Sequence, residues 1–450
     1  MANTDESRGC GKAGKRVWIQ TFGCQMNLYD SERVAGLLTQ QGYEMTPRLS
    51  EADVVLFNTC SIRELAEQKA TSAIGMLAGL KQRRPDLVLG VIGCMAQNRK
   101  GELLSRFPHL DLICGPQNLS DVPQLVERVQ RGEKHLLSLD RGDFAVREEV
   151  KALRRESQHK AWITIIEGCN YACSYCIVPR VRGREFSRPA AAILEEAEQL
   201  RDQGYQEVTL LGQTVNAYYD ETARLDFADL LAELASRVKI PWIRFMTSHP
   251  GKADRRLFEV MRDYPNVCEH LHLPFQSGSD RILEEMRRTY TRQRYCELVE
   301  EYRGLVAEGT LTTDVIVGFP GETEEEFEET VSLMREVAFN DAFLFKFSPR
   351  KGTLAAKLED DVPRQVKEKR HQTLCLLQEG IRRQKIENAI GTHQEVLLEV
   401  ASKKNQGDFL GRTRGYQKCV VEANENLIGK IIHVKVNAVE GETLRGALEG

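Results

Sequence analysis

Three cysteines in one short loop have the spacing in this chain that best suits chemistry. Cys169, Cys173 and Cys176 follow a C-x3-C-x2-C pattern directly after the apolar run 162–166. Closely spaced thiolates are soft ligands that suit zinc or an iron–sulfur cluster. Structural zinc usually takes four ligands, and no fourth lies nearby in sequence. Three thiolates on a four-iron cluster leave one iron open to a small molecule. Zinc completed by a distant residue, or three unrelated core cysteines, are the alternatives.

A second set of cysteines is scattered along the first hundred residues, but each member follows a predicted strand. Cys24 follows the predicted strand at 17–19, Cys60 follows that at 53–57, and Cys94 follows that at 87–92. In a parallel sheet the loops after the strands gather at one edge, so the three thiols could converge. A single cysteine in this position is usually a small buried residue, and that is the alternative. Cys114 has an apolar setting that favours the core.

The elements that position the second set form a short α/β pattern. The sequence predicts strands at 17–19, 53–57 and 87–92 and helices at 29–41 and 62–81. Strands that alternate with helices indicate a small parallel sheet.

A longer α/β run follows and carries the cysteine loop. Its six βα units predict a partial, open β/α barrel, whose active site would lie at the carboxyl ends of the strands. The polar and glycine-rich turns after these strands would then surround one mouth and form a cofactor pocket. The candidate cofactor-binding residues there are Gln213, Ser248, Gln276, Ser277 and Gly318. The predicted strands are 162–166, 207–211, 242–246, 271–275, 313–317 and 343–347.

The pattern changes after about residue 384 to short alternating strands with glycine turns, which predicts a small antiparallel barrel or sandwich. Its basic residues suit contact with a phosphate backbone, or are a solvated face. They are Lys403, Lys404, Arg412, Arg414, Lys418, Lys430 and Lys435. A second basic cluster follows the cysteine loop and suits a polyanionic substrate, with internal salt bridges as the alternative. It comprises Arg180, Arg182, Arg184 and Arg188.

Bulk composition narrows the class of protein. The chain has 450 residues and a formal net charge of −4, so no global positive field indicates nucleic acid. No apolar run approaches the roughly 20 residues that cross a bilayer. The polar start lacks the apolar segment of a secretory signal. We therefore expect a cytoplasmic protein without a membrane partner, in which the 12 cysteines are ligands or core residues rather than disulfides.

With these residues in view, the chain resembles the MiaB-type methylthiotransferases of the radical S-adenosylmethionine (SAM) superfamily. The resemblance implies an N-terminal methylthiotransferase domain at 15–130 and a radical SAM core at 161–383. It also implies an RNA-binding TRAM domain at 384–449. We expect a disordered tail at 1–14 and a charged connection at 131–160.

Two motifs distinguish branches within this family. The stretches 21–27 (TFGCQMN) and 58–64 (NTCSIRE) resemble the branch that methylthiolates isopentenyladenosine in tRNA. The branch acting on a ribosomal protein usually has Pro-Lys-Asn after the first cysteine, and the branch acting on threonylcarbamoyladenosine usually has Lys-Val-Asn. The implied partner is a tRNA anticodon stem-loop with isopentenyladenosine at position 37. The resemblance identifies neither the electron donor nor the sulfur donor.

The resemblance also implies the cofactors: SAM and two [4Fe–4S] clusters. Cys169, Cys173 and Cys176 would hold the radical SAM cluster, and the three N-terminal cysteines would hold an auxiliary cluster that presents sulfur. The turn after the second core strand departs from the Gly-Gly-Glu common in the superfamily and reads Leu211-Gly212-Gln213. The fifth-strand motif is matched only by Ile316 and Gly318.

The implied reaction replaces the hydrogen on C2 of the adenine by a methylthio group. That carbon carries no acidic proton that a base could remove, so the reaction needs a radical route supplied by a cofactor. Two alternatives remain. One is a radical SAM enzyme of another class, such as an RNA methylase, with structural N-terminal cysteines. It would hold about four irons per chain rather than about eight. The other is a non-catalytic iron–sulfur module that binds RNA or carries electrons.

Overall fold

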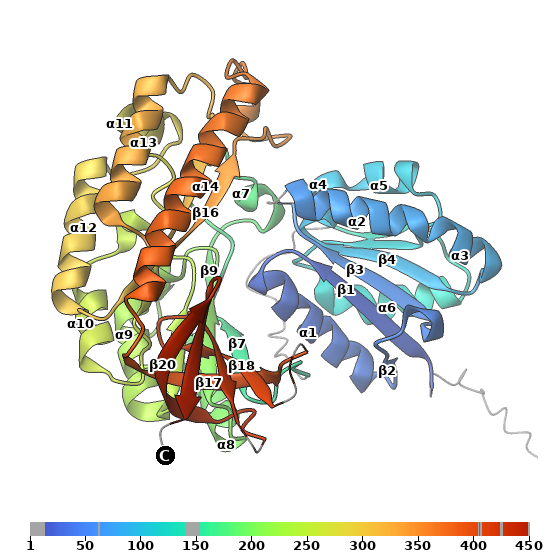
Figure 1. The fold of residues 1–450 in the computed structure, drawn as a ribbon. Coiled ribbons are helices and arrows are strands. Elements are labelled where there is room, and N and C mark those ends of the chain that lie inside the picture. Colours follow the sequence, from blue (N-terminus) through green and yellow to red (C-terminus); the bar gives the residue numbers. More distant parts are fainter. Residues whose placement is uncertain are drawn as a thin grey trace, which may run out of the picture. The chain divides into compact units, whose positions relative to one another are not determined.

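The computed structural model describes residues 14–61, 64–139, 154–403, 405, 407–423 and 426–448. Among them no helix is long and apolar enough to span a membrane. The chain divides into two compact units (Figure 1). The first comprises Met1–Glu156 together with Arg180–Gly183, and the second comprises Ser157–Pro179 together with Arg184–Gly450.

The first unit is built on a six-stranded parallel sheet in the order β2-β1-β3-β4-β5-β6. The predicted small parallel sheet is therefore confirmed. Its strands are β1 Arg16–Phe22, β2 Glu44–Met45, β3 Val54–Thr59, β4 Val88–Gly93, β5 Leu112–Cys114 and β6 Leu136–Ser138. Its helices are α1 Gln25–Gln40, α2 Glu64–Met76, α3 Ala78–Arg83, α4 Cys94–Arg99, α5 Gly101–Arg106 and α6 Val122–Gln130, with short 3-10 turns at Leu49–Glu51 and Leu119–Asp121.

Helices cover both faces of this sheet because its central strands are apolar on both sides. On β3, Val54 and Leu56 pack with α1 and α6, whereas Val55 and Phe57 pack with α2, α4 and α5. A parallel sheet covered on both faces requires such continuous apolar strands. This burial fixes where each strand ends, and therefore where the residue after each strand lies.

The sequence does not predict β2, β5 and β6, which have only two or three residues each and show no clear alternation. Cys114 lies on β5 and is fully buried in the core, which confirms its interpretation as a core residue. The charged range 131–160 includes the strand β6. Within that range, residues 140–153 lie outside the described part of the chain, as do the tail residues 1–13 with Cys10.

The second unit begins with six parallel strands in two three-stranded sheets, ordered β13-β10-β7 and β14-β15-β16. A parallel bridge between Ile243 and Val267 links β13 to the segment that leads into β14. The predicted partial barrel of six βα units is confirmed. The strands are β7 Lys160–Thr164, β10 Glu207–Leu211, β13 Trp242–Phe245, β14 His270–His272, β15 Thr310–Val317 and β16 Asp341–Lys346.

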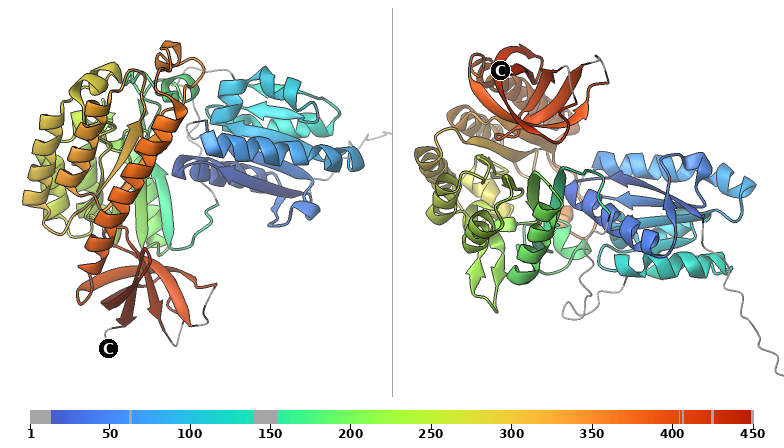
Figure 2. Two further views of the ribbon diagram at one scale, coloured as in Figure 1. Left: turned by 45° about the horizontal axis from the view of Figure 1, so that its top comes forward. Right: turned by 90° about the horizontal axis from the view of Figure 1, so that it is seen from below.

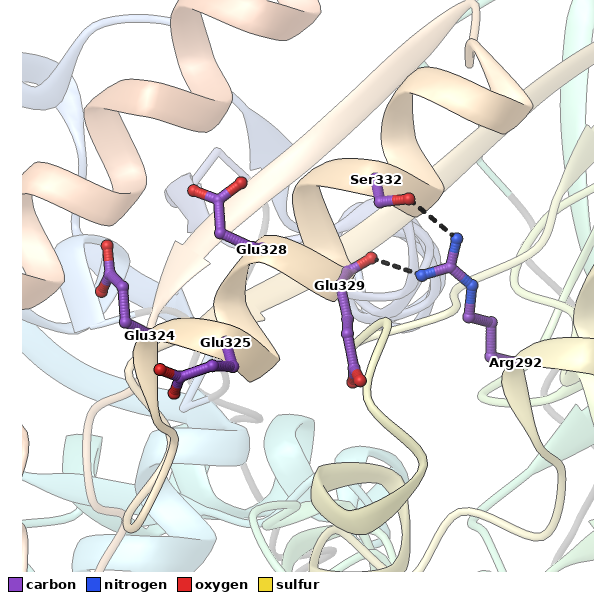
Figure 3. Close-up of a pocket in the computed structure, with 6 residues that line it drawn as sticks. All are labelled: Arg292, Glu324, Glu325, Glu328, Glu329 and Ser332. Atoms are coloured by element: carbon purple, nitrogen blue, oxygen red, sulfur yellow. Dashed lines mark hydrogen bonds between the residues drawn. The ribbon is translucent and has the colours of Figure 1, made fainter.

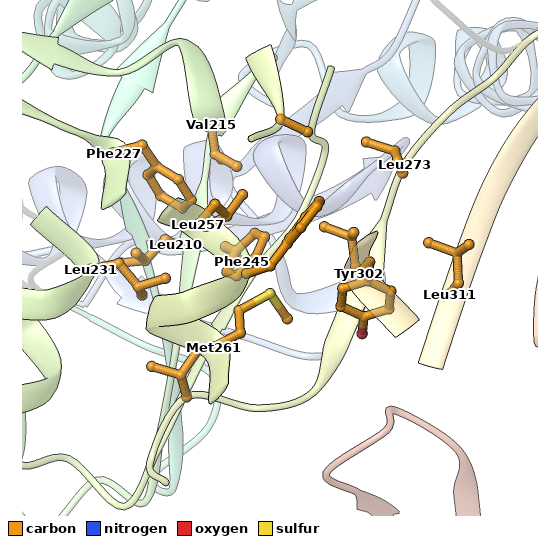
Figure 4. Packing of buried hydrophobic residues seen from close by; sticks show 14 of the residues in the cluster. Leu210, Val215, Phe227, Leu231, Phe245, Leu257, Met261, Leu273, Tyr302 and Leu311 are labelled. Carbon is orange, nitrogen blue, oxygen red and sulfur yellow. The ribbon is translucent and has the colours of Figure 1, made fainter. Parts of the chain in front are cut away.

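Amphipathic helices pack against the outer face of these strands and form the largest core of the protein (Figure 4). One of them, α13 (Glu324–Val337), begins with a capping box at Thr323. The Thr323 hydroxyl accepts a hydrogen bond from the backbone N–H of Glu326, and the Glu326 carboxylate accepts one from the backbone N–H of Thr323. The helices of this core are α8 Ala190–Asp202, α9 Phe227–Glu233, α10 Arg255–Asp263, α11 Asp280–Glu285, α12 Arg292–Leu305, α13 Glu324–Val337 and α14 Arg364–Glu387. A short helix, α7 Val178–Val181, follows the cysteine loop. Short elements between the helices are β8 Ile166–Glu167, β9 Phe186–Ser187, β11 Tyr219–Asp220, β12 Leu225–Asp226, a π-helix at Leu234–Val238 and 3-10 turns at Val215–Ala217, Pro250–Lys252 and Ala355–Lys357.

The chain ends in a closed five-stranded barrel in the order β17-β18-β19-β21-β20. The predicted barrel is confirmed, with one difference: β19 and β21 pair in parallel and the other pairs are antiparallel. Ile386, at the end of α14, belongs to the barrel core, so this helix and the barrel share apolar packing. The strands are β17 His393–Ala401, β18 Asp408–Thr413, β19 Lys418–Glu422, β20 Ile431–Glu440 and β21 Thr443–Leu448.

Figure 2 shows this barrel beside the partial β/α barrel of the same unit. Charged side chains attach the two. Arg244 on β13 donates to Glu207 at 2.6 Å and to the carbonyl of Thr413 at 2.7 Å. Arg414 donates to Glu269 at 2.6 and 2.8 Å. Because all these groups lie within one compact unit, the barrel is an integral part of the second unit.

Candidate metal centres and cofactor site

The three N-terminal cysteines lie at the carboxyl ends of three neighbouring strands. Cys24 is the residue before α1, Cys60 directly follows β3, and Cys94 is the first residue of α4 after β4. Since β1, β3 and β4 are adjacent in the sheet, the fold brings these residues to the same edge. Cys60 and Cys94 are each 1% exposed.

Glycine and asparagine side chains hold the three loops close together. Gly23 lacks a Cβ atom that would lie 2.7 Å from the Cβ of Cys60, and a Cβ on Gly93 would collide with Asn58. Gly93 also has a φ of 91°, a conformation that favours glycine. The amide of Asn27 donates to Asn58 Oδ1 at 3.1 Å, and Asn58 donates back to the carbonyl of Asn27 at 2.7 Å. This pairing ties the Cys24 loop to the end of β3.

A buried guanidinium lies beside these thiols. Arg182, in the segment 180–183 that belongs to the first unit, is 4% exposed and donates to Asp30 at 2.5 Å. The amide of Gln117 donates to the carbonyl of Arg182 at 2.5 Å. The positive charge of Arg182 also acts on the Cys94 thiol. The segment therefore brings one positive charge to the cysteine edge of the sheet.

The thiols at this edge interact with one another. The pKa of Cys24 is lowered to about 6, and a hydrogen bond with Cys60 is the largest cause. Desolvation raises this pKa, whereas the charge of Arg182 lowers it. Burial raises the pKa of Cys94, and the charge of Arg182 opposes that rise. The site therefore favours the thiolate form of Cys24, which is the form that binds metals.

The cysteine loop of the second unit begins after β8. Gln213, in the turn after β10, accepts a hydrogen bond from the backbone N–H of Gly168 and so fixes the start of the loop. The Sγ of Cys169 lies 3.8 Å from the hydroxyl of Thr214, and Cys176 N donates to the carbonyl of Cys173 at 3.1 Å. Burial is the largest cause that raises the pKa of Cys176 to about 12, with the nearby Cys173 thiol also contributing.

Arg288 is a second, half-buried cation beside thiols, and no pattern in the sequence indicates it. Its Nη1 lies 3.5 Å from Cys173 Sγ, its Nε donates to the Tyr290 hydroxyl at 2.9 Å, and its Nη2 donates to the carbonyl of Pro274 at 3.1 Å. The turn between α11 and α12 that carries Arg288 has no motif in the sequence, so only the fold relates it to the cysteine loop.

Two of the predicted cofactor-binding residues carry buried polar atoms without a hydrogen-bond partner. These are Ser248 Oγ and Gln276 Oε1, from side chains that are 4% and 7% exposed. Gln276 has a φ of 67°, and Thr247, before Ser248, has a φ of 70°. Strained backbone and unsatisfied buried polar groups concentrate at ligand sites. Both features fit a polar ligand such as SAM at this end of β13 and β14.

The structure gives local roles to the other predicted residues. Ser277 accepts a hydrogen bond from Ser279 N at 3.3 Å. Gly318 has a φ of 70°, its N–H donates to Glu322 at 2.6 Å, and the side chain of Lys367 fills the space beside its Cα. These contacts shape the turns after β14 and β15.

His249 is another site residue that no sequence motif indicates. The ring of Tyr171, in the cysteine loop, stacks on it with centroids 3.8 Å apart and an interplanar angle of 11°. Burial is the largest cause that lowers the pKa of His249 to about 2, followed by the charge of Arg288. This neutral ring links the loop to the end of β13, and its Nε2 is a further buried atom without a partner.

The donor chemistry of both cysteine sets fits iron–sulfur ligation, because each offers three soft thiols. In the described part of the chain, however, no three His, Cys, Asp or Glu side chains are close enough together to hold a metal ion. The assignment of the two sets therefore rests on donor type and on their position at strand ends, not on a closed ligand geometry.

The structure corrects the interpretation of several basic residues. Arg182 and Arg188 are buried and pair with Asp30 and with Glu196, so they serve internal ion pairs. Of the cluster after the cysteine loop, Arg180 and Arg184 are exposed.

In the C-terminal barrel, Arg414 binds Glu269 and is not available to a phosphate. Arg412 lies 4.2 Å from the ring centroid of Tyr416. The exposed cations of that cluster are Lys403, Lys418, Lys430 and Lys435, and Lys404 lies outside the described residues.

A shallow depression of about 430 Å³ lies on the outer side of α13, apart from both sets of cysteines (Figure 3). Glutamates of α13 and the side chain of Arg292 line it. It includes no cysteine and none of the predicted cofactor-binding residues, so it is separate from the candidate site.

Comparison with known proteins gives three matches to family models. Residues 16–115 match the uncharacterized protein family UPF0004, residues 163–334 match the radical SAM superfamily, and residues 388–448 match the TRAM domain. Each match falls on one of the three folded regions described above.

Curated relatives cover nearly the whole chain. The tRNA-2-methylthio-N(6)-dimethylallyladenosine synthase of Carboxydothermus hydrogenoformans is 45% identical over 97% of this chain and 100% of its own length. The chain belongs to the family of these synthases. The protein of the same name from Acetivibrio thermocellus is 44% identical over 97% of this chain and 92% of its own length. The protein is therefore a radical SAM enzyme and a tRNA methylthiotransferase, which uses SAM and [4Fe–4S] clusters.

Solved structures of similar fold are more distant. The radical SAM methyltransferase TsrM from Kitasatospora setae matches with a TM-score of 0.55 and 16% identity, over 73% of this chain and 72% of that one. The cobalamin-dependent SAM radical enzyme OxsB matches with a TM-score of 0.52 and 12% identity, over 82% of this chain and 56% of that one. At these identities the likeness concerns the fold alone.

Proposed function

We propose that the protein methylthiolates C2 of N6-isopentenyladenosine at position 37 in the anticodon stem-loop of tRNA. The observation that carries this proposal is the presence of two separate sets of three thiols, one at the sheet edge of the first unit and one in the loop after β8. A reaction that both activates a C–H bond and delivers sulfur needs two such sites. The relatives' printed names and the motifs around Cys24 and Cys60 support this substrate.

We assign one cluster to each set of thiols. Cys169, Cys173 and Cys176 would hold the cluster that binds SAM, and the three N-terminal cysteines would hold the auxiliary cluster. When bound, the first cluster supplies an electron that cleaves SAM, and the second keeps sulfur near the substrate. The protein's own residues then bind, orient and shield the reactants.

Around the SAM-binding cluster, each neighbouring residue has a defined task. Gln213 fixes the beginning of the loop through Gly168 N–H. Arg288 places a half-buried positive charge 3.5 Å from Cys173 Sγ, and this charge compensates thiolate charge. Tyr171 and His249 stack and close one side of the loop.

We assign polar contacts with SAM to Ser248 and Gln276, because their buried atoms lack partners within the protein. Ser277, Gly318 and Gln213 contribute to the same site by shaping the turns that surround it. These roles agree with the position of a cofactor at the carboxyl ends of barrel strands.

The domain at 15–130 would then deliver sulfur, the core at 161–383 would generate the radical, and the barrel at 384–449 would bind tRNA. Three exposed lysines lie there: Lys418 on β19, Lys430 in the turn before β20, and Lys435 on β20. Such lysines bind phosphates, while the target base leaves its stack at a cost of a few kcal/mol. A tRNA substrate and a set of reduced cysteines support a cytoplasmic location.

The test is mass analysis of tRNA nucleosides after incubation of reconstituted, chemically reduced enzyme with SAM. Two substrates are compared: tRNA that carries N6-isopentenyladenosine at position 37 and the same tRNA without the isopentenyl group. We expect 2-methylthio-N6-isopentenyladenosine from the first and little product from the second. A methylated nucleoside without sulfur, from enzyme with about four irons per chain, would support the RNA methylase alternative instead.

A further inference from the structure

Alternate residues of β14 and β15 face away from the helices. Leu271, Leu311 and Val315 belong to the core between the strands and the outer helices. Because successive side chains of a strand point to opposite faces, their neighbours in sequence lie on the inner face of the open barrel. Four polar members of this set, together with Phe343 of β16, form the inner-face cluster. The cluster comprises His270, His272, Thr312, Asp314 and Phe343.

A hydrogen-bond network orders this inner-face cluster. The Thr312 hydroxyl lies 2.9 Å from His272 Nδ1 and 3.1 Å from His270 Nε2, so it can donate to one ring and accept from the other. The remaining nitrogen of His272, Nε2, lies 3.5 Å from Asp314 Oδ1. The network therefore fixes the imidazole of His272 beside the carboxylate of Asp314.

Phe343 stands beside this pair. It is the cross-strand partner of Asp314, and its ring meets the His272 ring edge-on, with centroids 5.9 Å apart and an interplanar angle of 74°. Phe343 is 42% exposed and the side chain of Asp314 is 29% exposed. The cluster thus presents an aromatic ring and a carboxylate side by side, both accessible.

The neighbours of the cluster define how it can be reached. On one side, the ring of Tyr416 from the C-terminal barrel stacks on His270, with centroids 5.1 Å apart. On the other side, Ser248 N donates to the carbonyl of His272 and Gln276 N donates to the carbonyl of Asp314. Protein therefore fills the space beside His270, while the accessible members adjoin the residues assigned to SAM.

We propose that Phe343 and Asp314 bind the target adenine, with the base stacked on the Phe343 ring and its N6–H donated to the Asp314 carboxylate. This inference deepens the proposed function and rests on it. An N6-alkylated adenine keeps a single N6–H, and a fixed carboxylate at hydrogen-bond distance would select bases that keep it. Every base has a π face, so the Phe343 ring supplies affinity and Asp314 supplies selectivity. His272 acts as a positioning residue for the carboxylate.

The experiment measures binding of synthetic anticodon stem-loops to the reconstituted full-length enzyme with SAM and without reductant. One loop carries N6-isopentenyladenosine at position 37, and the other carries an N6,N6-dialkyladenosine that has no N6–H. We expect the wild-type enzyme to prefer the first loop about tenfold, as for a hydrogen bond to a charged group. Asp314→Ala should bind both loops equally. Phe343→Ala should weaken both about tenfold, and Phe343→Tyr should restore binding.

Deoxyadenosine formation from SAM without RNA is measured on the same preparations and should not change. Asp202→Asn and Leu376→Ala, at exposed positions on α8 and α14, serve as matched controls.

Three outcomes separate the ideas. If Asp314→Ala keeps the wild-type preference for the loop with an N6–H, the inference is wrong. If either variant slows SAM cleavage in the absence of RNA, the two residues belong to the SAM site and the inference is also wrong. If the wild-type enzyme makes no methylthio product on the isopentenyladenosine loop, the proposed function fails, whatever the variants do.

Discussion

The two cysteine sets are assembled in opposite ways. Cys169, Cys173 and Cys176 share one loop, and all three are partly exposed. The N-terminal set comes from the ends of three adjacent strands, and two of its members are almost completely buried. The first set is therefore a local property of the chain. The second exists only where the parallel sheet has formed.

The cation beside each set differs as well. Arg288 approaches Cys173 from a turn of the same unit and also binds a tyrosine hydroxyl. Arg182 is paired with the buried Asp30 and comes from the short segment that follows the cysteine loop in sequence but belongs to the first unit. The N-terminal thiols therefore lie in a buried and tightly packed environment beside an internal ion pair, whereas the loop thiols are partly exposed.

The largest expected effect comes from the loop set. Cys173→Ala should abolish SAM cleavage, because loss of one of three thiolates strips the cluster or misplaces its open iron. Release of deoxyadenosine by the reduced enzyme, measured by chromatography, checks this. Cys296→Ala, which removes a partly exposed thiol on α12, is the matched control and should retain activity. Wild-type deoxyadenosine release from the Cys173 variant would contradict the assignment of the loop.

Replacing Cys24, Cys60 and Cys94 together by Ala should separate the two sets. We expect about four irons per chain rather than about eight, slow deoxyadenosine formation, and no methylthio product. Iron, deoxyadenosine and modified nucleoside are measured on one preparation. Methylthiolated tRNA from this triple variant would show that the sheet-edge thiols are structural residues only.

Arg182→Ala tests whether the buried ion pair with Asp30 stabilises the sheet edge that carries the N-terminal cysteines. The substitution leaves the carboxylate of Asp30 buried without its cation, which typically costs about 3–5 kcal/mol of stability. Hydrogen exchange of the α1 amides in the full chain should accelerate. Arg184→Ala, at an exposed position two residues later, is the matched control. Equal protection of α1 in both variants would show that Arg182 does not stabilise this edge.

The smallest effect concerns the C-terminal barrel, which carries no thiol of either set. Replacing Lys418, Lys430 and Lys435 by Ala should weaken tRNA binding several-fold. The slope of log K against the logarithm of the salt concentration should become shallower by about two. SAM cleavage without RNA should not change. Lys239→Ala, at an exposed position after the π-helix, is the control. An unchanged salt slope in the triple variant would place the phosphate contacts elsewhere.

Much of the architecture followed from patterns in the sequence. The alternation of strands and helices predicted the parallel sheet and the six-unit core, because burial on both faces leaves apolar strands of recognisable length. The shortest elements escaped, since two or three residues such as those of β2 and β6 carry no periodicity. The barrel strands β18 and β21 also escaped, and with them the parallel pairing of β19 with β21.

The site shows the same division. The spacing of Cys169, Cys173 and Cys176, and the position of a cysteine after each of three strands, were evident from the sequence, because each follows from local order along the chain. Tertiary structure alone decided the partners of the charged and aromatic residues. Arg182 meets Asp30 across 152 positions and Arg414 meets Glu269 across 145, so individual members of two basic clusters became internal ion pairs. Phe343 and Asp314 became neighbours only through the register of β15 with β16, since cross-strand pairing is a long-range contact that composition does not encode.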